Sequence, residues 1–405
     1  MRALADIAVS RGHTVTGSDN SLCGHDPKNV EGADLVVYTN AIPQNNPELV
    51  RARELNIPVI ERASYLGELS HAYENVIAIA GCHGKSTTTA MLGNIYAKRR
   101  ATVHAGVAHG SKIGADKYFV TEACEYRESF LHLDPTIGIV LNVQYDHPDY
   151  YKTEDALIGA YKAFCSKCGK VIVNGDDPAC DGIADAPVTF GLGKACDYRA
   201  ENIINRDGFR AFTLNGKRHA SVRLSVAGEH NVYNALASIA AASENGLPLT
   251  EIIAGLSSYT GIARRFERKG IAYGKTVFTD YAHHPAEIAA TIKTAREIFP
   301  SVAVVFQPHT YTRTQSLMDE FASALSLADT VVLAPIFSAR EKPIPGITSH
   351  ALCRKIIQKK EKAYSFDTFS EILDYCKTLK EKALIFMGAG DIDKAAEIFT
   401  QNSFI

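Results

Sequence analysis

The 405-residue sequence lacks long apolar runs and an excess of charge of either sign. No run approaches the roughly 18 apolar residues of a membrane-spanning helix. The first residues, MRALADIAVSRGHTV, lack the layout of a signal peptide, so we expect no membrane insertion. Lysine and arginine total 43 against 45 aspartate and glutamate, a formal net charge of -2. This balance predicts no bulk attraction to nucleic acid or to an anionic membrane.

The nine cysteines form no recognisable framework. Cys165 and Cys168 make one CxxC pair, but no second pair and no histidine pair follows at zinc spacing. We therefore expect no structural zinc. Scattered free thiols are typical of a reducing compartment, which predicts a cytoplasmic protein.

What the sequence does contain is a regular alternation of strand-like and helix-like runs. With 46% hydrophobic and 22% charged residues, a chain of this length predicts two or three globular α/β domains with parallel sheets. The expected domains are 1–73, 74–265 and 266–405. The expected strands lie at 34–39, 57–61, 76–81, 118–123, 136–142, 169–177, 276–282, 302–309, 330–337 and 382–390. Short alternating runs with Asn-Gly and Asp-Gly turns over 197–231 predict a small antiparallel patch.

The segment VIAIAGCHGKSTTTAML, residues 76–92, predicts a phosphate-binding loop. A buried strand ends in a Gly-rich turn and enters a helix, whose first N–H groups and dipole favour an anion. Lys85 can reach phosphate oxygens, and the Ser86 hydroxyl can bind Mg²⁺. The common P-loop spacing would require glycine where Ile79 stands, so a tight turn with an incidental lysine is the alternative. The loop alone fits a kinase, a GTPase, a transporter ATPase or a ligase.

Polar side chains follow the next two predicted strands. Glu122 ends one strand with Glu125 one turn later, and Asn142 ends the next, ahead of the Asp146-His147 pair. Ligands in open α/β sheets bind at the carboxyl ends of parallel strands, so both clusters should share the edge with the phosphate loop. Carboxylate and imidazole are possible Mg²⁺ or Mn²⁺ ligands. Solvated loop residues are the alternative.

Two later segments carry polar side chains whose role the residues leave open. Asn231, in GEHNVYNALA, could contact a base, but a helix cap is the favoured interpretation. The cationic run YTGIARRFERKG, residues 259–270, is typical of a solvated face, although an arginine near a nucleotide could clamp or stack on it.

Taken together, these motifs resemble the Mur ligase family, in the branch that adds L-alanine to UDP-N-acetylmuramate. The resemblance covers almost the whole chain in order. It is carried by YTNAIPQNNPEL, GCHGKSTTT, TEACEYRESFLHL, NVQYDHPDYY, GEHNVYNALA, RRFERKG, DYAHHPAE, FQPHTYTRT, SAREKPIPG and MGAGDI.

The resemblance implies three α/β domains: a Rossmann-like UDP-sugar domain, a central P-loop ATPase-like domain and a C-terminal Rossmann-like amino-acid domain. It also implies the reaction. ATP phosphorylates the muramate carboxylate to an acyl phosphate, the amine of L-alanine attacks it, and phosphate leaves from a tetrahedral intermediate. The expected setting is cytoplasmic peptidoglycan precursor synthesis by a monomer or homodimer.

The resemblance also implies site residues. The expected catalytic residues are Lys85, Glu122, His147 and His284. The expected nucleotide contacts are Gly81, Cys82, His83, Gly84, Lys85, Ser86, Thr87, Asn231, Arg265 and Asp280. The expected Mg²⁺ (or Mn²⁺) ligands are Ser86, Glu122 and His147. L-alanine is expected at His309 and Arg313, and the ATP contacts are expected to be divided between the second and third domains.

The match departs from the family pattern at its beginning. The family begins with a strand and a Gly-rich turn, whereas Met1 here opens directly in the first expected helix, and TGSD at 16–19 matches the end of the next strand. We therefore expect an N-terminal domain without its first strand. A misplaced start codon or a trimmed N-terminus explains this simply, and the alternative is a chain with weakened UDP-sugar binding. The alternatives are a recycling ligase that adds a preformed peptide to the same sugar, or a nucleotide-binding homologue with impaired catalysis.

Overall fold

The computed structural model describes residues 1–19, 24–106, 111–147, 150–339, 341–359 and 362–401. The chain divides into two compact units. The first comprises Met1–Glu201, Thr213–Ala220 and Tyr233–Ser258, and the second Asn202–Phe212, Ser221–Val232 and Tyr259–Ile405. Among the described residues, no helix is both long and apolar enough to cross a membrane.

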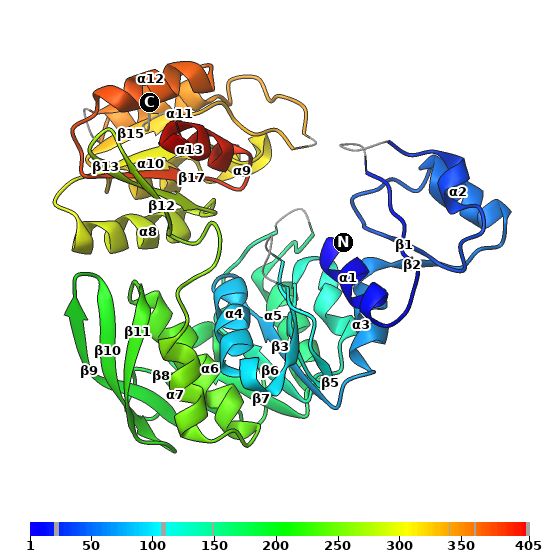
Figure 1. The fold of residues 1–405 in the computed structure, drawn as a ribbon. Coiled ribbons are helices and arrows are strands. Elements are labelled where there is room, and N and C mark those ends of the chain that lie inside the picture. The colour runs from blue at the N-terminus through cyan, green and yellow to red at the C-terminus, as the bar shows by residue number, and fades with distance from the viewer. Residues whose placement is uncertain (20–23, 107–110, 148–149, 340, 360–361, 402–405) are drawn as a thin grey trace. The chain divides into compact units, whose positions relative to one another are not determined.

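The N-terminal part of the first unit is small (Figure 1). Its elements are α1 (Arg2–Ser10), η1 (Pro27–Val30), β1 (Val36–Tyr38), α2 (Pro47–Glu54), β2 (Val59–Glu61) and α3 (Arg62–Ser70). The expected opening helix is confirmed as α1, and β1 pairs with β2 in a two-stranded parallel sheet. The expected strand ending in TGSD was wrong, because residues 13–19 form no strand.

Helix α1 is held by apolar packing within the first unit. Leu4 and Ile7, one helical turn apart, are buried in the same cluster as Leu66 of α3 and Phe119 of the central sheet. At the end of the helix the Arg11 guanidinium lies 4.7 Å from the centre of the Tyr73 ring.

The central elements build a nine-stranded sheet in the order β11-β10-β9-β8-β7-β6-β3-β5-β4. The seven strands from β9 to β4 pair in parallel, as the alternating pattern predicted for most of them. Strand β9 begins the segment expected to be antiparallel, but its pairing with β8 is parallel. The strands are β3 (Asn75–Ala80), β4 (Ala101–His104), β5 (Ala115–Glu122), β6 (Ile137–Val140), β7 (Lys170–Asn174), β8 (Val188–Gly191), β9 (Tyr198–Arg206), β10 (Phe209–Gly216) and β11 (Ala220–Ala227). The helices are α4 (Lys85–Ile95), η2 (Ala97–Arg99), η3 (Tyr126–His132), α5 (Glu154–Ser166), η4 (Pro178–Cys180), α6 (His230–Glu244) and α7 (Leu249–Ser257).

The second unit contains a six-stranded sheet in the order β12-β13-β17-β14-β15-β16. Only β12 is antiparallel to its neighbour. The strands are β12 (Glu267–Ala272), β13 (Lys275–Asp280), β14 (Val302–Phe306), β15 (Thr330–Leu333), β16 (Ala363–Ser365) and β17 (Ala383–Met387). The helices are α8 (Pro285–Ile298), α9 (Tyr311–Ser316), α10 (Met318–Leu325), α11 (Ser349–Ile357), α12 (Phe369–Thr378) and α13 (Ile392–Gln401).

Alternate residues of this second sheet pack on opposite faces, because successive strand side chains point to opposite sides. Val304 and Ile385 join a core with α8, α10 and α11, whereas Val305 and Phe386 join a second core with α12 and α13. Helices therefore cover both faces of the sheet, which leaves the carboxyl ends of its strands as the open edge for ligands (Figure 1).

A buried histidine makes the stability of the first unit depend on pH. Burial lowers the pKa of His104, the last residue of β4, to about 3, and its Nδ1 lies 3.0 Å from the Thr121 hydroxyl. The folded chain therefore keeps His104 neutral while the unfolded chain binds a proton below its ordinary pKa. The stabilisation is complete above about pH 6.5 and is lost as the pH falls, by about 1.4 kcal/mol per unit.

We expect the free energy of unfolding to fall less in His104→Leu than in the parent chain between pH 7 and pH 5. The difference between the two falls, measured by urea unfolding, should be roughly 2 kcal/mol. His219→Leu, at an exposed position of the same unit, is the control and should keep the parental pH dependence. An equal loss in His104→Leu and the parent would contradict this assignment.

Candidate active site

The turn between β3 and α4 holds the predicted phosphate loop. Gly81 has φ 135° and Gly84 has φ 86°, and both conformations favour glycine. Helix α4 begins at Lys85 with Gly84 as its N-cap and no side chain capping it. The first N–H groups of α4 are therefore not used by a cap, as an anion-binding helix terminus requires.

The end of β6 fixes the conformation of this loop. Asn142 Oδ1 accepts a hydrogen bond from the His83 backbone N–H at 2.9 Å, and its Nδ2 donates to the His83 carbonyl at 3.0 Å. The Cys82 thiol donates to the Gln144 carbonyl at 2.8 Å and accepts from the Gln144 N–H at 3.1 Å. Burial raises the pKa of Cys82 to about 12, so this thiol stays protonated and can act as a donor.

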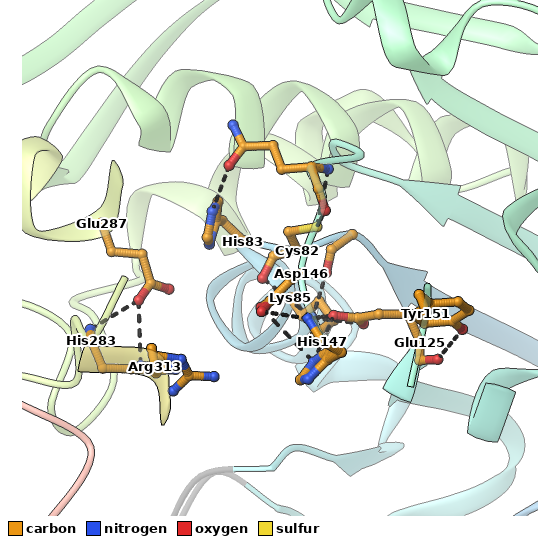
Figure 2. Close-up of polar contacts among 12 residues, drawn as sticks. Cys82, His83, Lys85, Glu125, Asp146, His147, Tyr151, His283, Glu287 and Arg313 are labelled. Carbon is orange, nitrogen blue, oxygen red and sulfur yellow. Dashed lines mark hydrogen bonds and ion pairs between the residues drawn. The ribbon is translucent and has the colours of Figure 1, made fainter. Parts of the chain in front are cut away.

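Lys85 lies at the centre of a charged cluster (Figure 2). Its Nζ is 2.9 Å and 3.1 Å from the two carboxylate oxygens of Glu125, and it also contacts the Gly81 carbonyl. His147 Nε2 lies 3.8 Å from Glu125 and 3.9 Å from Asp146. Burial by itself would lower the pKa of Lys85, but the Glu125 carboxylate raises it above its ordinary value, so the side chain is a cation.

The structure only partly assembles the predicted metal ligands. Ser86 is buried in the first turn of α4. Glu122 Oε1 accepts a hydrogen bond from the Gly106 N–H at 2.7 Å, and His147 lies beside Glu125. Within the described ranges, no three His, Cys, Asp or Glu side chains come together in a way that could hold a metal ion. The Ser86 and Glu122 oxygens nevertheless suit Mg²⁺, which commonly binds one or two protein oxygens together with phosphate and water.

A side chain at Gly84 would collide with its surroundings. A Cβ there would lie 2.5 Å from Asn234 Oδ1 and 3.1 Å from Leu141 Cδ1. We expect Gly84→Ala to lower the free energy of unfolding by about 2–3 kcal/mol and to weaken nucleotide binding measured by calorimetry.

Gly246→Ala is the matched control for this substitution. Gly246 has nearly the same φ, 82°, but a Cβ there would meet nothing within 4 Å. Gly246→Ala should lower the free energy of unfolding by about 1 kcal/mol, from conformational strain alone. Equal losses in the two variants would show that the collision at Gly84 is unimportant.

The second unit holds the other predicted nucleotide contacts. Asp280 ends β13, and its carboxylate accepts hydrogen bonds from the Phe266 N–H at 2.8 Å and the Ala282 N–H at 2.7 Å. Burial raises the pKa of Asp280 to about 6. The guanidinium groups of Arg264 and Arg265 lie 4.8 Å and 5.5 Å from the centre of the Tyr281 ring.

Two of the predicted residues in this unit have local structural contacts. Asn231 is the second residue of α6, and its Nδ2 donates to the Ala227 carbonyl at 2.6 Å. The interpretation of Asn231 as a helix cap was therefore wrong. His284 is the N-cap of α8, where its Nδ1 accepts a hydrogen bond from the Ala286 N–H at 3.4 Å.

The residues predicted to receive the amino acid lie together after β14. Arg313 Nη1 is 3.4 Å from His309 Nδ1, and the His309 ring stacks on Phe337 with centroids 5.7 Å apart. Burial, with His283 and Arg313 nearby, lowers the pKa of His309 to about 4, so its ring is neutral near pH 7. His283 lies 6.0 Å from His309 between ring centroids and 3.4 Å from Glu287 (Figure 2).

Several residues of these clusters were not predicted as site residues. Glu125 and Asn142 were noted only as polar residues at strand ends, whereas His283, Glu287 and Phe337 were not noted individually. The duplicated histidine in DYAHHPAE was the available signal for His283. No sequence pattern distinguishes Phe337 from an ordinary core aromatic.

Comparison with known proteins places the chain among ligases. Residues 1–74 match the model described as Mur ligase family, catalytic domain. Residues 79–242 match the Mur ligase middle domain, and 264–390 match the Mur ligase, glutamate ligase domain.

Individual relatives match over almost their full length. UDP-N-acetylmuramate–L-alanine ligases from Acetivibrio thermocellus and Clostridium novyi are each 41% identical, over 99% of this chain and 93% and 95% of theirs. The crystal structure of UDP-N-acetylmuramate-alanine ligase MurC from Thermotoga maritima is 27% identical with a TM-score of 0.84, covering 99% of this chain and 96% of that one. The chain has the phosphate loop, and helices cover both faces of its C-terminal sheet. Together with these features, the matches establish that the chain belongs to the Mur ligase family.

Proposed function

We propose that this chain is an ATP-dependent ligase that joins L-alanine to UDP-N-acetylmuramate through an acyl phosphate, as a step in peptidoglycan precursor synthesis. The observation that carries the proposal is the near-complete match to relatives named for this activity. It is supported by the loop at α4, where uncapped N–H groups and the Lys85 ammonium offer an anion site.

In the first step a muramate carboxylate oxygen attacks the γ-phosphorus of ATP, and the bond to the β-phosphate oxygen breaks to release ADP. Little covalent chemistry is required of the protein, because phosphoryl transfer depends mainly on positioning and on stabilising charge. Lys85 and the first N–H groups of α4 would hold the phosphates through the loop formed by Gly81, Cys82, His83, Gly84, Ser86 and Thr87. Ser86 and Glu122, with His147 nearby, would hold Mg²⁺, which supplies further neutralisation of phosphate charge.

In the second step the neutral amine of L-alanine attacks the acyl carbon, inorganic phosphate leaves, and the proton lost by the nitrogen passes to the departing phosphate. Arg313 would bind the carboxylate of the amino acid, since a guanidinium matches carboxylate geometry. When Arg313 turns from His309 Nδ1 to that carboxylate, Nδ1 of the neutral ring can accept a hydrogen bond from the substrate amine and orient it. Arg265, Asp280 and Asn231 are proposed contacts of the nucleotide, and His284 a residue close to the reacting groups.

The proposal is tested by measuring phosphate release from ATP with Mg²⁺ and UDP-N-acetylmuramate, with and without L-alanine. Release that depends on alanine supports the proposed ligase. Release that depends on a preformed tripeptide would instead indicate recycling. ATP binding without turnover would indicate a homologue with impaired catalysis.

A further inference from the structure

Glu125 is a buried carboxylate to which neither the proposed reaction nor the predicted metal site gives a role. Only 2% of the residue is exposed. Its carbonyl accepts hydrogen bonds from the Tyr151 hydroxyl at 2.6 Å and the Glu128 N–H at 2.9 Å. The chain then passes through Arg127 at φ 51° and Glu128 at φ 55°, a conformation that costs free energy for residues other than glycine. The backbone is therefore strained at Arg127 and Glu128, directly after the residue that carries this buried carboxylate.

The contacts of Lys85 occupy its hydrogen-bonding capacity. An ammonium has three N–H donors. Lys85 Nζ contacts the Gly81 carbonyl, the Cys82 carbonyl at 3.4 Å and both oxygens of Glu125. Its side chain is 16% exposed and that of Glu125 is 3% exposed, so this ion pair is largely shielded from solvent (Figure 2). A phosphate can gain a hydrogen bond from Lys85 only by displacing one of these acceptors.

Of these acceptors, Glu125 is the one that bears charge, and so it is the one that phosphate replaces most directly. Two anions close to one ammonium repel each other, and this repulsion is strong where water is excluded. When Lys85 turns to phosphate, His147, with Nε2 3.8 Å from Glu125, is the nearest other basic side chain among the described contacts of that carboxylate. The Glu125 carboxylate therefore makes the free energy of nucleotide binding less favourable.

We propose that Glu125 is a positioning residue that holds Lys85 in the nucleotide-free enzyme and competes with nucleotide phosphate for its ammonium. This inference rests on the proposed function, since it requires that the loop bind a nucleotide. Glu125 then sets how tightly phosphate is held. Without it, ADP is retained more strongly after phosphoryl transfer.

The test is the affinity for ADP, measured by titration calorimetry on the full chain without divalent metal. Glu125→Gln keeps the shape and an acceptor for Lys85 but removes the negative charge. We expect the dissociation constant of this variant for ADP to fall about tenfold. This factor corresponds to the difference in free energy between a charge-assisted and a neutral hydrogen bond. Glu128→Gln makes the same change three residues later, away from the contacts of Lys85, and should leave the affinity unchanged.

An unchanged or weaker affinity in Glu125→Gln would overturn the competition while leaving the proposed ligase intact. Absence of ADP binding in the parent chain, together with absence of alanine-dependent phosphate release, would overturn both. Equal tightening in Glu128→Gln would also overturn the proposal, because the effect would then be one of general charge.

A second readout does not depend on nucleotide affinity. Acylation of lysines by an amine-directed ester, followed by mass spectrometry, reports how firmly Lys85 is held. Lys85 should react several-fold faster in Glu125→Gln than in the parent, while the exposed Lys162 reacts at the same rate in both and is the reference for the reagent. The buried Lys275 should stay slow to react in both, which reports an intact fold. Equal reactivity of Lys85 in the two proteins would contradict the holding role.

Discussion

Replacing Lys85 with alanine is expected to lower the rate of alanine-dependent phosphate release by at least about a thousandfold. Removing one preorganised charge at a developing anion typically costs 10²–10³ in rate, and Lys85 is proposed to hold phosphates in both the bound and the reacting state. The measurement is phosphate release under saturating substrates. Lys98→Ala, at an exposed position beyond the end of α4, should retain the parental rate.

The same substitution is expected to destabilise the protein, an effect that the sequence does not reveal. Glu125 would remain buried without its ammonium, and breaking a buried ion pair from one side costs about 3–5 kcal/mol. Urea unfolding should therefore show a large loss in Lys85→Ala.

The double variant Lys85→Ala with Glu125→Gln separates stability from catalysis. It removes both charges, so most of the lost unfolding free energy should return while phosphate release stays at the low rate of Lys85→Ala. If phosphate release returned together with stability, Lys85 would be a structural residue only. If stability did not return, the ion pair would not be the cause of the loss.

Replacing Arg313 with alanine is expected to raise the KM for L-alanine by about a hundredfold. A hydrogen bond to a charged group contributes roughly 1.5–3 kcal/mol, and a bidentate guanidinium–carboxylate pair lies at the upper end of that range. The KM for ATP should stay within a factor of about two, because Arg313 is assigned to the amino acid alone.

The control for this prediction is Arg296→Ala. Arg296, on α8, is exposed at its side chain and donates to the Leu327 carbonyl at 2.7 Å. It should leave both KM values unchanged. A rise in the KM for ATP that matched the rise for L-alanine in Arg313→Ala would place Arg313 in a general structural role instead.

The amino-acid sequence was sufficient to predict the α/β class, most of the strands and the phosphate loop. The buried runs that became β3, β6, β14 and β17 are short, apolar and followed by glycine or polar residues, so local pattern and burial agree. Short strands were missed where the pattern is weak. Strand β12 was interpreted as part of a cationic run, because Arg268 and Lys269 are adjacent and only Ile271 and Ala272 of the strand are apolar.

The sequence also failed at 13–19, where a motif match predicted a strand that does not form. A strand needs a neighbour with which to share hydrogen bonds, and residue pattern alone does not supply one. Only β1 and β2 pair in the sheet that the structure describes in this part of the chain.

The sequence by itself determined which residue types could meet a phosphate, because Gly81, Gly84, Lys85 and Ser86 lie within six consecutive positions where geometry is local. Only the tertiary structure decided what Lys85 contacts. Glu125 is 40 residues away along the chain, and its approach to within 2.9 Å depends on the parallel pairing of β3 with β5 and on the backbone turn that follows β5. Contacts between distant residues are set by the packing of whole elements, and that packing fixes both the charge of the site and its cost in stability.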